Sequence, residues 1–234
     1  MTEKIGYLQK NKKQDSNPEK IIVKVLENQT SLKNLFKSCD WIKNISFRRS
    51  FTNKIIDIKY MMFSCSFLKE IYFDLNNYNI GNLQNMSFLF SRCKSLKKAI
   101  LANFNSFNLI NIRGMFSECI CLEKVDFINF NTKNVSNMRE MFYECSKLKY
   151  VSFSNFDTKN ETDMSYMFFN CKALKHLDIS NFNIQNLDIQ KNIFFGCCNE
   201  LKNNIKEQKI NFKKEAYGYE NQLIPDFDIL KKNI

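Results

Sequence analysis

Residues 141–156 read MFYECSKLKYVSFSNF, and residues 167–182 read MFFNCKALKHLDISNF. Both stretches carry the pattern MF-x-x-C-x-x-L, then apolar residues at alternate positions, then the pair NF. They lie 26 residues apart, and a fixed period of this length is typical of a solenoid built from stacked coils. The cysteine of the pattern gives a reference position for the rest of the chain.

Cysteine recurs at this position along most of the chain. The spacings are 26, 28, 26, 26, 26 and 27 residues, between Cys39, Cys65, Cys93, Cys119, Cys145, Cys171 and Cys198. Apolar residues fill the columns four and three residues before these cysteines and three residues after them, and also the columns six and eight residues after the first six cysteines. A coil of this size cannot bury its own apolar face, so each must stack on the next. The pattern predicts about seven coils of 26 residues.

Within one coil the apolar period changes from that of a helix to that of a strand. The helical positions i, i+3, i+4, i+7 and i+10 are occupied by Met138, Met141, Phe142, Cys145 and Leu148, which predicts one stripe of an amphipathic helix. Val151 and Phe153 then alternate with polar neighbours, as in a strand with one buried face. If a helix is followed by a strand in every coil, the strands of successive coils are parallel. The predicted class is therefore α/β.

Asparagine fills two further columns. The first precedes a phenylalanine and comprises Asn103, Asn129, Asn155 and Asn181; the second follows that phenylalanine by four residues and comprises Asn108, Asn134, Asn160 and Asn186. An amide side chain both donates and accepts hydrogen bonds, so a stack of them can satisfy the backbone groups of turns. We expect these side chains to lie inside the turns of the solenoid.

The two ends of the chain differ from its middle. Residues 1–34 are predicted to form a tail and an N-terminal cap, with a strand at 20–26 (KIIVKVL) and Thr30 or Ser31 capping the first helix. Residues 35–205 form the predicted solenoid. Residues 206–234 carry Ile210 and Phe212, then turn polar, and are predicted to be a C-terminal cap or tail.

The repeated stretches resemble a known family. MFYECSKLKYVSFSNFDTKNETDMSYMFFNCKALKHLDISNF is similar to the 26-residue surface-protein repeat, also called the BspA-like (DUF285-type) leucine-rich repeat, and the match runs from about Leu35 to Leu201. The resemblance implies a leucine-rich-repeat-like solenoid that acts in adhesion or recognition. It also implies a place on surface or secreted proteins of bacteria and protists.

Charge and hydropathy limit the possible locations and partners. The net charge of +11 and the pI near 9.1 permit anionic partners. No run of 18 apolar residues occurs, so no transmembrane helix is expected. The first 20 residues lack the apolar core of a signal peptide. The residues therefore favour the cytoplasm, whereas the family resemblance favours the cell surface.

The cysteines and the single histidine do not form a recognisable catalytic or metal site. No C-x-x-C pair is present, and His176 is the one histidine. A Cys171–His176 dyad would lack a third group to orient the base. The repeated cysteines are expected to be a ladder of buried, reduced thiols, with Cys121 as the most exposed one. We expect no enzyme activity, no cofactor, no metal and no small-molecule substrate.

A column of lysines is the one candidate binding feature. Four residues after each reference cysteine stand Lys43, Lys69, Lys97, Glu123, Lys149, Lys175 and Lys202. In parallel stacked strands, neighbouring members lie about 5 Å apart, so the lysines Lys43, Lys69, Lys97, Lys149 and Lys175 would favour a line of anions. The alternative is that lysine simply solvates an exposed edge.

These patterns favour a non-catalytic module that recognises or scaffolds a protein partner along its surface. An adhesin-type surface domain is the alternative, and an anionic surface or glycan is a possible partner. A nucleic-acid-binding solenoid that uses the lysine column ranks third, because no aromatic residues interleave the lysines as base stacking requires.

Overall fold

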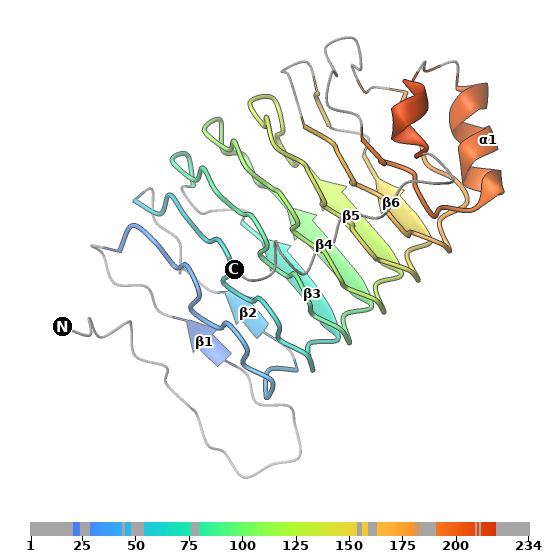
Figure 1. Ribbon diagram of the computed structural model, residues 1–234. Helices are drawn as coiled ribbons and strands as arrows, with labels where there is room; N and C mark the ends of the chain where they lie inside the picture. The colour runs from blue at the N-terminus through green and yellow to red at the C-terminus, as the bar shows by residue number, and fades with distance from the viewer. Residues whose placement is uncertain are drawn as a thin grey trace.

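The computed structural model describes residues 21–23, 29–43, 45–47, 54–75, 80–153, 156–158, 163–180, 182, 191–208, 210 and 212–218. These residues form a stack of parallel coils (Figure 1), with β1 toward one end and the helix α1 at the other. The predicted parallel solenoid is therefore confirmed, whereas the total of seven coils stays a prediction. The expectations for residues 1–20 and 219–234 lie outside the described residues.

Short strands line one side of the stack. They are β1 (Ile21–Val23), β2 (Ile45–Phe47), β3 (Glu70–Asp74), β4 (Lys98–Ala102), β5 (Lys124–Ile128) and β6 (Tyr150–Ser152). β1 pairs with β2, and β3 to β6 form a four-stranded parallel sheet in sequence order. The register joins equivalent positions of successive coils, as in Val125 opposite Val151. The strand predicted around Val151 is confirmed, because Val151 is buried while Tyr150 is exposed.

The helix predicted in each coil is wrong. Residues 113–118, which belong to the predicted helical stripe of one coil, form turns instead. Backbone N–H groups alternate between two kinds of partner. Gly114 and Phe116 donate to carbonyls of the next coil, Arg139 and Met141, at 2.8 and 2.9 Å. Ser117 donates three residues back to Gly114 at 3.0 Å. A helix would direct every N–H to the residue four positions back, whereas these turns bind coil to coil.

Left-handed residues explain why the helical spacing does not produce a helix. Two positions in each coil have positive φ, five residues and one residue before the cysteine, for example Gly114 (φ 58°) and Glu118 (φ 60°). A residue in this region interrupts a right-handed helix. The i, i+3, i+4 spacing of apolar residues therefore arises from two consecutive turns that face the same core.

A row of polar side chains caps these turns. The row is joined by parallel backbone bridges and comprises Ser31, Asp57, Asn85, Asn111, Asn137 and Asp163. In each coil its side-chain oxygen accepts a hydrogen bond from the N–H two residues on, as in Asn111 with Arg113 at 2.9 Å. Ser31, which was predicted to cap a helix, accepts in the same way from Lys33 at 3.1 Å. It caps a turn.

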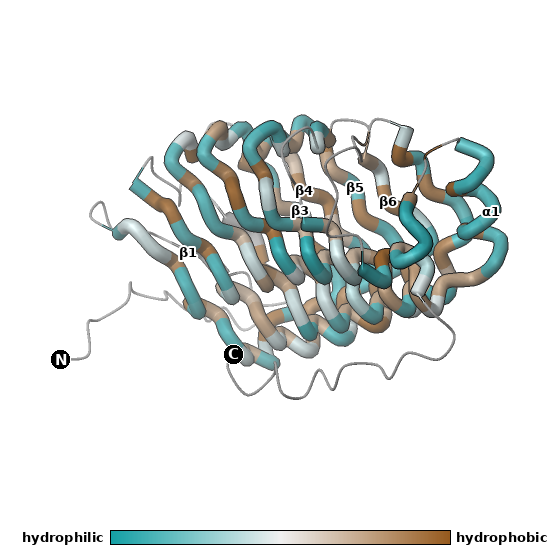
Figure 2. The backbone as a smooth tube through the Cα atoms, turned by 45° about the horizontal axis from the view of Figure 1, so that its top comes forward, coloured by the Kyte–Doolittle hydropathy of each residue, from teal (hydrophilic) through white to brown (hydrophobic). Residues whose placement is uncertain are grey.

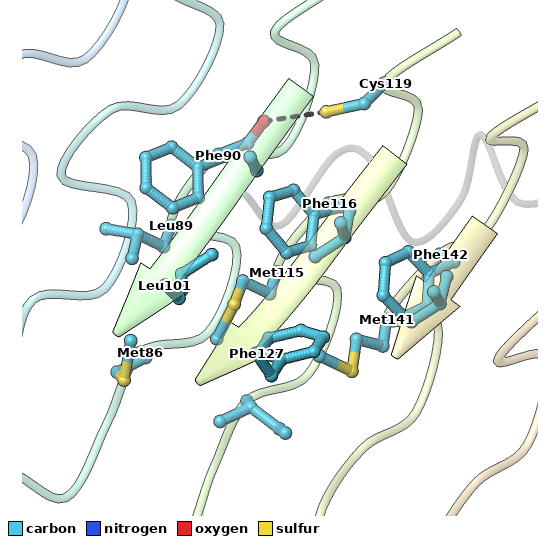
Figure 3. Close-up of a cluster of buried hydrophobic side chains, with 14 of the residues drawn as sticks. Met86, Leu89, Phe90, Leu101, Met115, Phe116, Cys119, Phe127, Met141 and Phe142 are labelled. Atoms are coloured by element: carbon cyan, nitrogen blue, oxygen red, sulfur yellow. Dashed lines mark hydrogen bonds between the residues drawn. The ribbon is translucent and has the colours of Figure 1, made fainter. Parts of the chain in front are cut away.

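In the core, equivalent apolar residues of successive coils lie in columns along the stack (Figure 3). Phe90, Phe116 and Phe142 lie ring on ring, with centroids 5.4 and 5.6 Å apart. The thiol of Cys119 donates a hydrogen bond to the carbonyl of Phe90 at 3.0 Å, and Cys145 repeats the contact with Phe116 at 3.1 Å. These cysteines are fully buried. The apolar segments recur at equivalent places along the stack (Figure 2).

The cysteine register predicted for the last repeat is shifted by one residue. Cys197, not Cys198, donates to the carbonyl of Phe168 at 3.1 Å and is buried. The phenylalanine of this coil that continues the stacked column is Phe194, whose ring centroid lies 6.0 Å from that of Phe168. The adjacent Cys197–Cys198 pair made the sequence ambiguous, and the 26-residue period decides in favour of Cys197. At the other end Cys39 is only half-buried, and its sulfur lies 3.9 Å from the carbonyl oxygen of Lys37 in its own coil.

The asparagine columns do not lie inside the turns as predicted. Asn134 and Asn108 are exposed, although their amide nitrogens bond the carbonyls of Phe107 and Gly81 in the preceding coil. Asn129 donates to the Asn103 side chain at 3.0 Å, also near the surface. These amides link coils from outside. The members at 155, 160, 181 and 186 lie outside the described residues.

The C-terminal end is covered by α1 (Asn199–Glu207) and a 3-10 turn, η1 (Lys214–Ala216). Leu201 and Ile205 of α1 are buried against the stack, and Ala216 accepts a hydrogen bond from the N–H of Phe194 at 2.8 Å. In the part of the chain that the structure describes, no helix has the length and apolarity needed to cross a membrane.

Candidate binding surface

The outer face of the four-stranded sheet presents apolar side chains to solvent. Strand residues alternate, so the neighbours of each buried residue point outward. Tyr72 on β3 is 59% exposed, Ile128 on β5 is 46% exposed and Tyr150 on β6 is 48% exposed. Lysines stand among them: Lys124 lies 4.9 Å from the centre of the Tyr150 ring and 3.2 Å from Asp126. This mixture of apolar and charged groups is able to contact another macromolecule.

From Lys43 to Lys149 the predicted lysine column forms a continuous edge beside this face. The N–H of Lys97 donates to the carbonyl of Lys69 at 2.8 Å, and the N–H of Lys149 donates to the carbonyl of Glu123 at 2.9 Å. Lys69 donates in turn to Lys43 at 3.3 Å, and Glu123 to Lys97 at 2.8 Å. All five candidate lysines, Lys43, Lys69, Lys97, Lys149 and Lys175, are exposed. Lys202 instead lies on α1.

Acidic partners divide the column into two halves. Lys149 forms an ion pair with Glu123 at 2.9 Å, and Lys175 forms one with Glu200 of α1 at 3.1 Å. Lys43, Lys69 and Lys97 have no ion pair with any other described residue. Within the described part of the chain, the N-terminal half therefore holds the lysines of the column that form no ion pair.

Glu123 keeps its negative charge within this edge. The hydrogen bond from Lys149, its charge, and the nearby charges of Lys97 and Lys147 lower the pKa of the Glu123 carboxyl. A carboxyl with a lowered pKa is ionised at all pH values near neutrality, so Glu123 remains a fixed interruption of the positive row.

Two exposed aromatic residues lie close in sequence to the first two lysines of the column. Trp41 is 45% exposed and Phe67 is 54% exposed. They stand two residues before Lys43 and Lys69, and the intervening Ile42 and Leu68 are buried. Both aromatics lie in the turns that precede β2 and β3. The sequence held this signal, because both residues lie two positions after a reference cysteine.

The Cys171–His176 pair has no catalytic geometry. Cys171 is fully buried, and burial raises the pKa of its thiol well above 9.0. The His176 side chain is 73% exposed, and its Nε2 lies 3.5 Å from Glu200. Over the described ranges, histidine, cysteine and carboxylate side chains form no cluster that could hold a metal ion. All nine cysteines are free thiols.

A family model described as "Mycoplasma protein of unknown function, DUF285" matches residues 30–124 and 110–220. No curated protein matches the chain. A leucine-rich repeat protein from Eubacterium ventriosum ATCC 27560 matches in structure, with 18% sequence identity and a TM-score of 0.46. The match covers 78% of this chain and 45% of that one, so the chain spans under half the length of this neighbour.

Proposed function

The chain belongs to the DUF285 repeat family, and on that premise we propose that it is a non-catalytic module that binds a protein partner through the outer face of β3 to β6. The exposure of Tyr72, Ile128 and Tyr150 on this one face carries the proposal. Aromatic and branched apolar side chains that are gathered on a surface commonly mark a site of protein contact. The candidate lysines beside the face favour a partner with an acidic surface.

A paired set of variants tests the use of this face. Tyr72→Ser with Ile128→Ser removes two exposed apolar contacts without opening the core. Phe107→Ser is the matched control, because Phe107 is 66% exposed but lies outside the sheet. Proteins retained from an extract of the source cells by the wild type and the control should be lost by the double variant. Equal retention by all three would place recognition elsewhere.

The lysine column is proposed as the electrostatic part of this contact. Poly-glutamate is a suitable acidic probe, and its binding should weaken as salt is added, because the exposed charges are screened. Lys69→Glu with Lys97→Glu should reduce the affinity about tenfold or more, since each reversal replaces an attraction with a repulsion. Lys149→Glu with Lys175→Glu, where both lysines already have acidic partners, should have the smaller effect. Glu123→Lys should strengthen binding.

Single-stranded nucleic acid is a second candidate ligand, favoured by the exposure of Trp41 and Phe67, each two residues from a lysine of the column. Bases stack on exposed aromatics while lysines contact the phosphates. Trp41 is the single tryptophan of the chain, so its fluorescence reports the site directly. Oligothymidine should quench this fluorescence, and heparin, which has no bases, should not.

Phe67→Ala leaves the Trp41 signal in place and should lower oligothymidine affinity roughly tenfold, the scale of one stacking contact. Phe107→Ala is the control. Quenching that is equally strong in both variants, or equally strong with heparin, would rule out base stacking at this site.

A cell-surface location is proposed only from the family resemblance, and there the same module would act as an adhesin. Protease treatment of intact cells separates the two locations. A surface domain should be digested, whereas a cytoplasmic one should stay whole until the cells are lysed.

A further inference from the structure

The hydrogen-bond ladder of the sheet stops after β6. Just before this point, the N–H of Ala173 still donates to the carbonyl of Ser146 in the preceding coil at 3.2 Å. Residues 176–180, which occupy the next strand position, pair with no strand. Among the described residues, no backbone hydrogen bond joins 150–153 to 176–179. The two segments are neighbours in the stack without being neighbours in the sheet.

The far side of residues 176–180 is already occupied. The N–H of Leu177 donates to the Asn204 side chain at 3.1 Å, and the N–H of Ile179 donates to the Gln208 side chain at 3.1 Å. The Gln208 amide also donates to the carbonyl of Leu177 at 2.6 Å. Side chains from the C-terminal end of the stack thus replace a further strand on this side.

The alternation of peptide groups identifies the atoms that face the interruption. In a strand, the N–H and C=O of one residue point to one neighbour and those of the next residue to the other. Because Leu177 and Ile179 direct theirs to Asn204 and Gln208, His176 and Asp178 direct theirs toward β6. Val151 in β6 and Phe153 just after it hold the equivalent places, so their N–H groups face residues 176–179. The carbonyl of Phe153 already accepts a hydrogen bond from the N–H of Phe156 at 2.9 Å. A row of backbone groups thus lies along each side without a partner strand.

A cavity of about 300 Å³ occupies this position. It is lined by residues 150–153 and 176–179 and by Phe182, and we refer to it as the β6 slot. Buried side chains, among them Val151, Phe153 and Ile179, form its floor, while the exposed Tyr150 and His176 stand at its rim. Its volume is at the lower end of the range of about 300–1,000 Å³ that is usual for ligand sites.

We propose that the β6 slot binds an extended peptide segment of a partner protein by strand addition. This inference rests on the proposed role in protein recognition and names a different contact for it. A peptide backbone is the ligand whose donors and acceptors match a row of unpaired strand groups on each side. Left unpaired and away from water, such groups are costly, so a strand gains affinity by pairing them.

The lining also selects side chains of the peptide. Residues that point inward must be apolar, because they meet Val151, Leu177 and Phe182. The residue between them points outward, where Asp178 is exposed. Hydrogen bonds from Ser180 lower the pKa of the Asp178 carboxyl, so it is charged near neutral pH and favours a basic residue. The preferred segment is therefore apolar–basic–apolar.

Amide hydrogen exchange of the full chain tests the slot with one defined probe, acetyl-Ser-Val-Lys-Ile-Ser-amide. At a peptide concentration ten times Kd, exchange at Val151, Phe153, His176 and Asp178 should slow by roughly tenfold, as mass action requires. Val125, which pairs with Val151 of β6, serves as an internal control and should not change. The same peptide methylated on its central three amide nitrogens should give no protection, because it cannot donate to the slot.

Two variants separate this proposal from that of the sheet face. Asp178→Asn keeps the acceptor for Ser180 and should weaken peptide binding about threefold, the scale of one exposed ion pair. Tyr72→Ser with Ile128→Ser should leave the protection by the peptide unchanged, even if those variants lose the protein partner. Amides of the slot that exchange slowly without peptide would overturn the proposal, since the slot would be closed or filled by another part of the chain. Equal protection by the methylated peptide would also overturn it.

Discussion

At the scale of single residues, the repeated cysteine joins one coil to the previous one. Cys93, Cys119, Cys145 and Cys171 each donate to a carbonyl of the preceding coil, at 3.0 to 3.2 Å. A buried thiol behaves as a small apolar group with a weak donor. Leucine would make no hydrogen bond and would overpack the site because it is larger, and serine would make the bond at a desolvation cost.

Thiol labelling tests this role. Burial raises the pKa of the Cys119, Cys145 and Cys171 thiols above the ordinary value of 9.0, so the reactive thiolate is absent near pH 8. Cys121 is half-exposed, with the Lys147 amine 4.0 Å from its sulfur, and should be alkylated first. Mass spectrometry of the native protein labelled over time measures the order. Labelling of Cys145 as fast as Cys121 would contradict the buried ladder.

The same pKa direction gives a pH dependence. A thiol whose folded pKa is raised favours the folded state fully below pH 9.0, the ordinary thiol value. That contribution is lost as the pH rises above this value, because the unfolded chain then releases protons that the folded chain retains. Denaturant midpoints measured between pH 8 and pH 11 should therefore fall. A midpoint that stays constant over this range would contradict the burial of the thiols.

The aromatic column supplies the second residue-scale test. Phe142 is fully buried between Phe116 and Phe168, with ring centroids 5.6 Å away on both sides. Phe142→Ala should lower the free energy of unfolding by about 3–5 kcal/mol, the usual cost of deleting a core phenyl ring. Phe107→Ala, at an exposed position, should change it by about 0.5 kcal/mol or less. Urea denaturation compares the two, and similar losses would contradict the predicted core.

At the scale of elements, the sequence predicted the strands but misassigned the helices. Alternation around Val151 has one structural solution, because a period of two occurs only in extended backbone. The spacing at Met138, Met141 and Phe142 is compatible with two structures, namely a helix or consecutive turns that face one core. Backbone φ angles decide between them, and most of the left-handed positions hold residues other than glycine, such as Glu118 and Glu144. The positive φ angles could therefore hardly be predicted from the residue types.

Gly114 allows a direct test of the turns. Its φ is +58°, and a Cβ there would lie 2.3 Å from a ring carbon of the buried Phe88. Gly114→Ala should therefore destabilise the fold by about 2 kcal/mol or more, combining left-handed strain with displacement of the ring. Ser117→Ala, in the same turn but without positive φ, should cost about 1 kcal/mol or less. If alanine at 114 were neutral, as in a helix, the turn assignment would be wrong.

At the scale of the whole molecule, the repeat predicted the stacking but not the surface. Columns of Cys, Phe and Leu identified the core because burial constrains residue type in every coil. The lysine column was visible because it recurs at one position of successive coils, but the ion pair of Lys175 with Glu200 of α1 depends on the packing of the chain end. The β6 slot was hidden for a related reason, since it arises where residues 176–179 do not pair with β6. Contacts that occur once, and not in every coil, produce no repeating pattern in the sequence.

The central claim is that backbone bonds between coils, and not helices, hold this solenoid together. Far-UV circular dichroism of the full chain measures it most directly. The described part of the 234 residues has one α-helix, of nine residues, so the account predicts a spectrum of strands and turns with a weak helical band at 222 nm. A helical fraction of about a third, which is typical of globular proteins, would contradict this expectation.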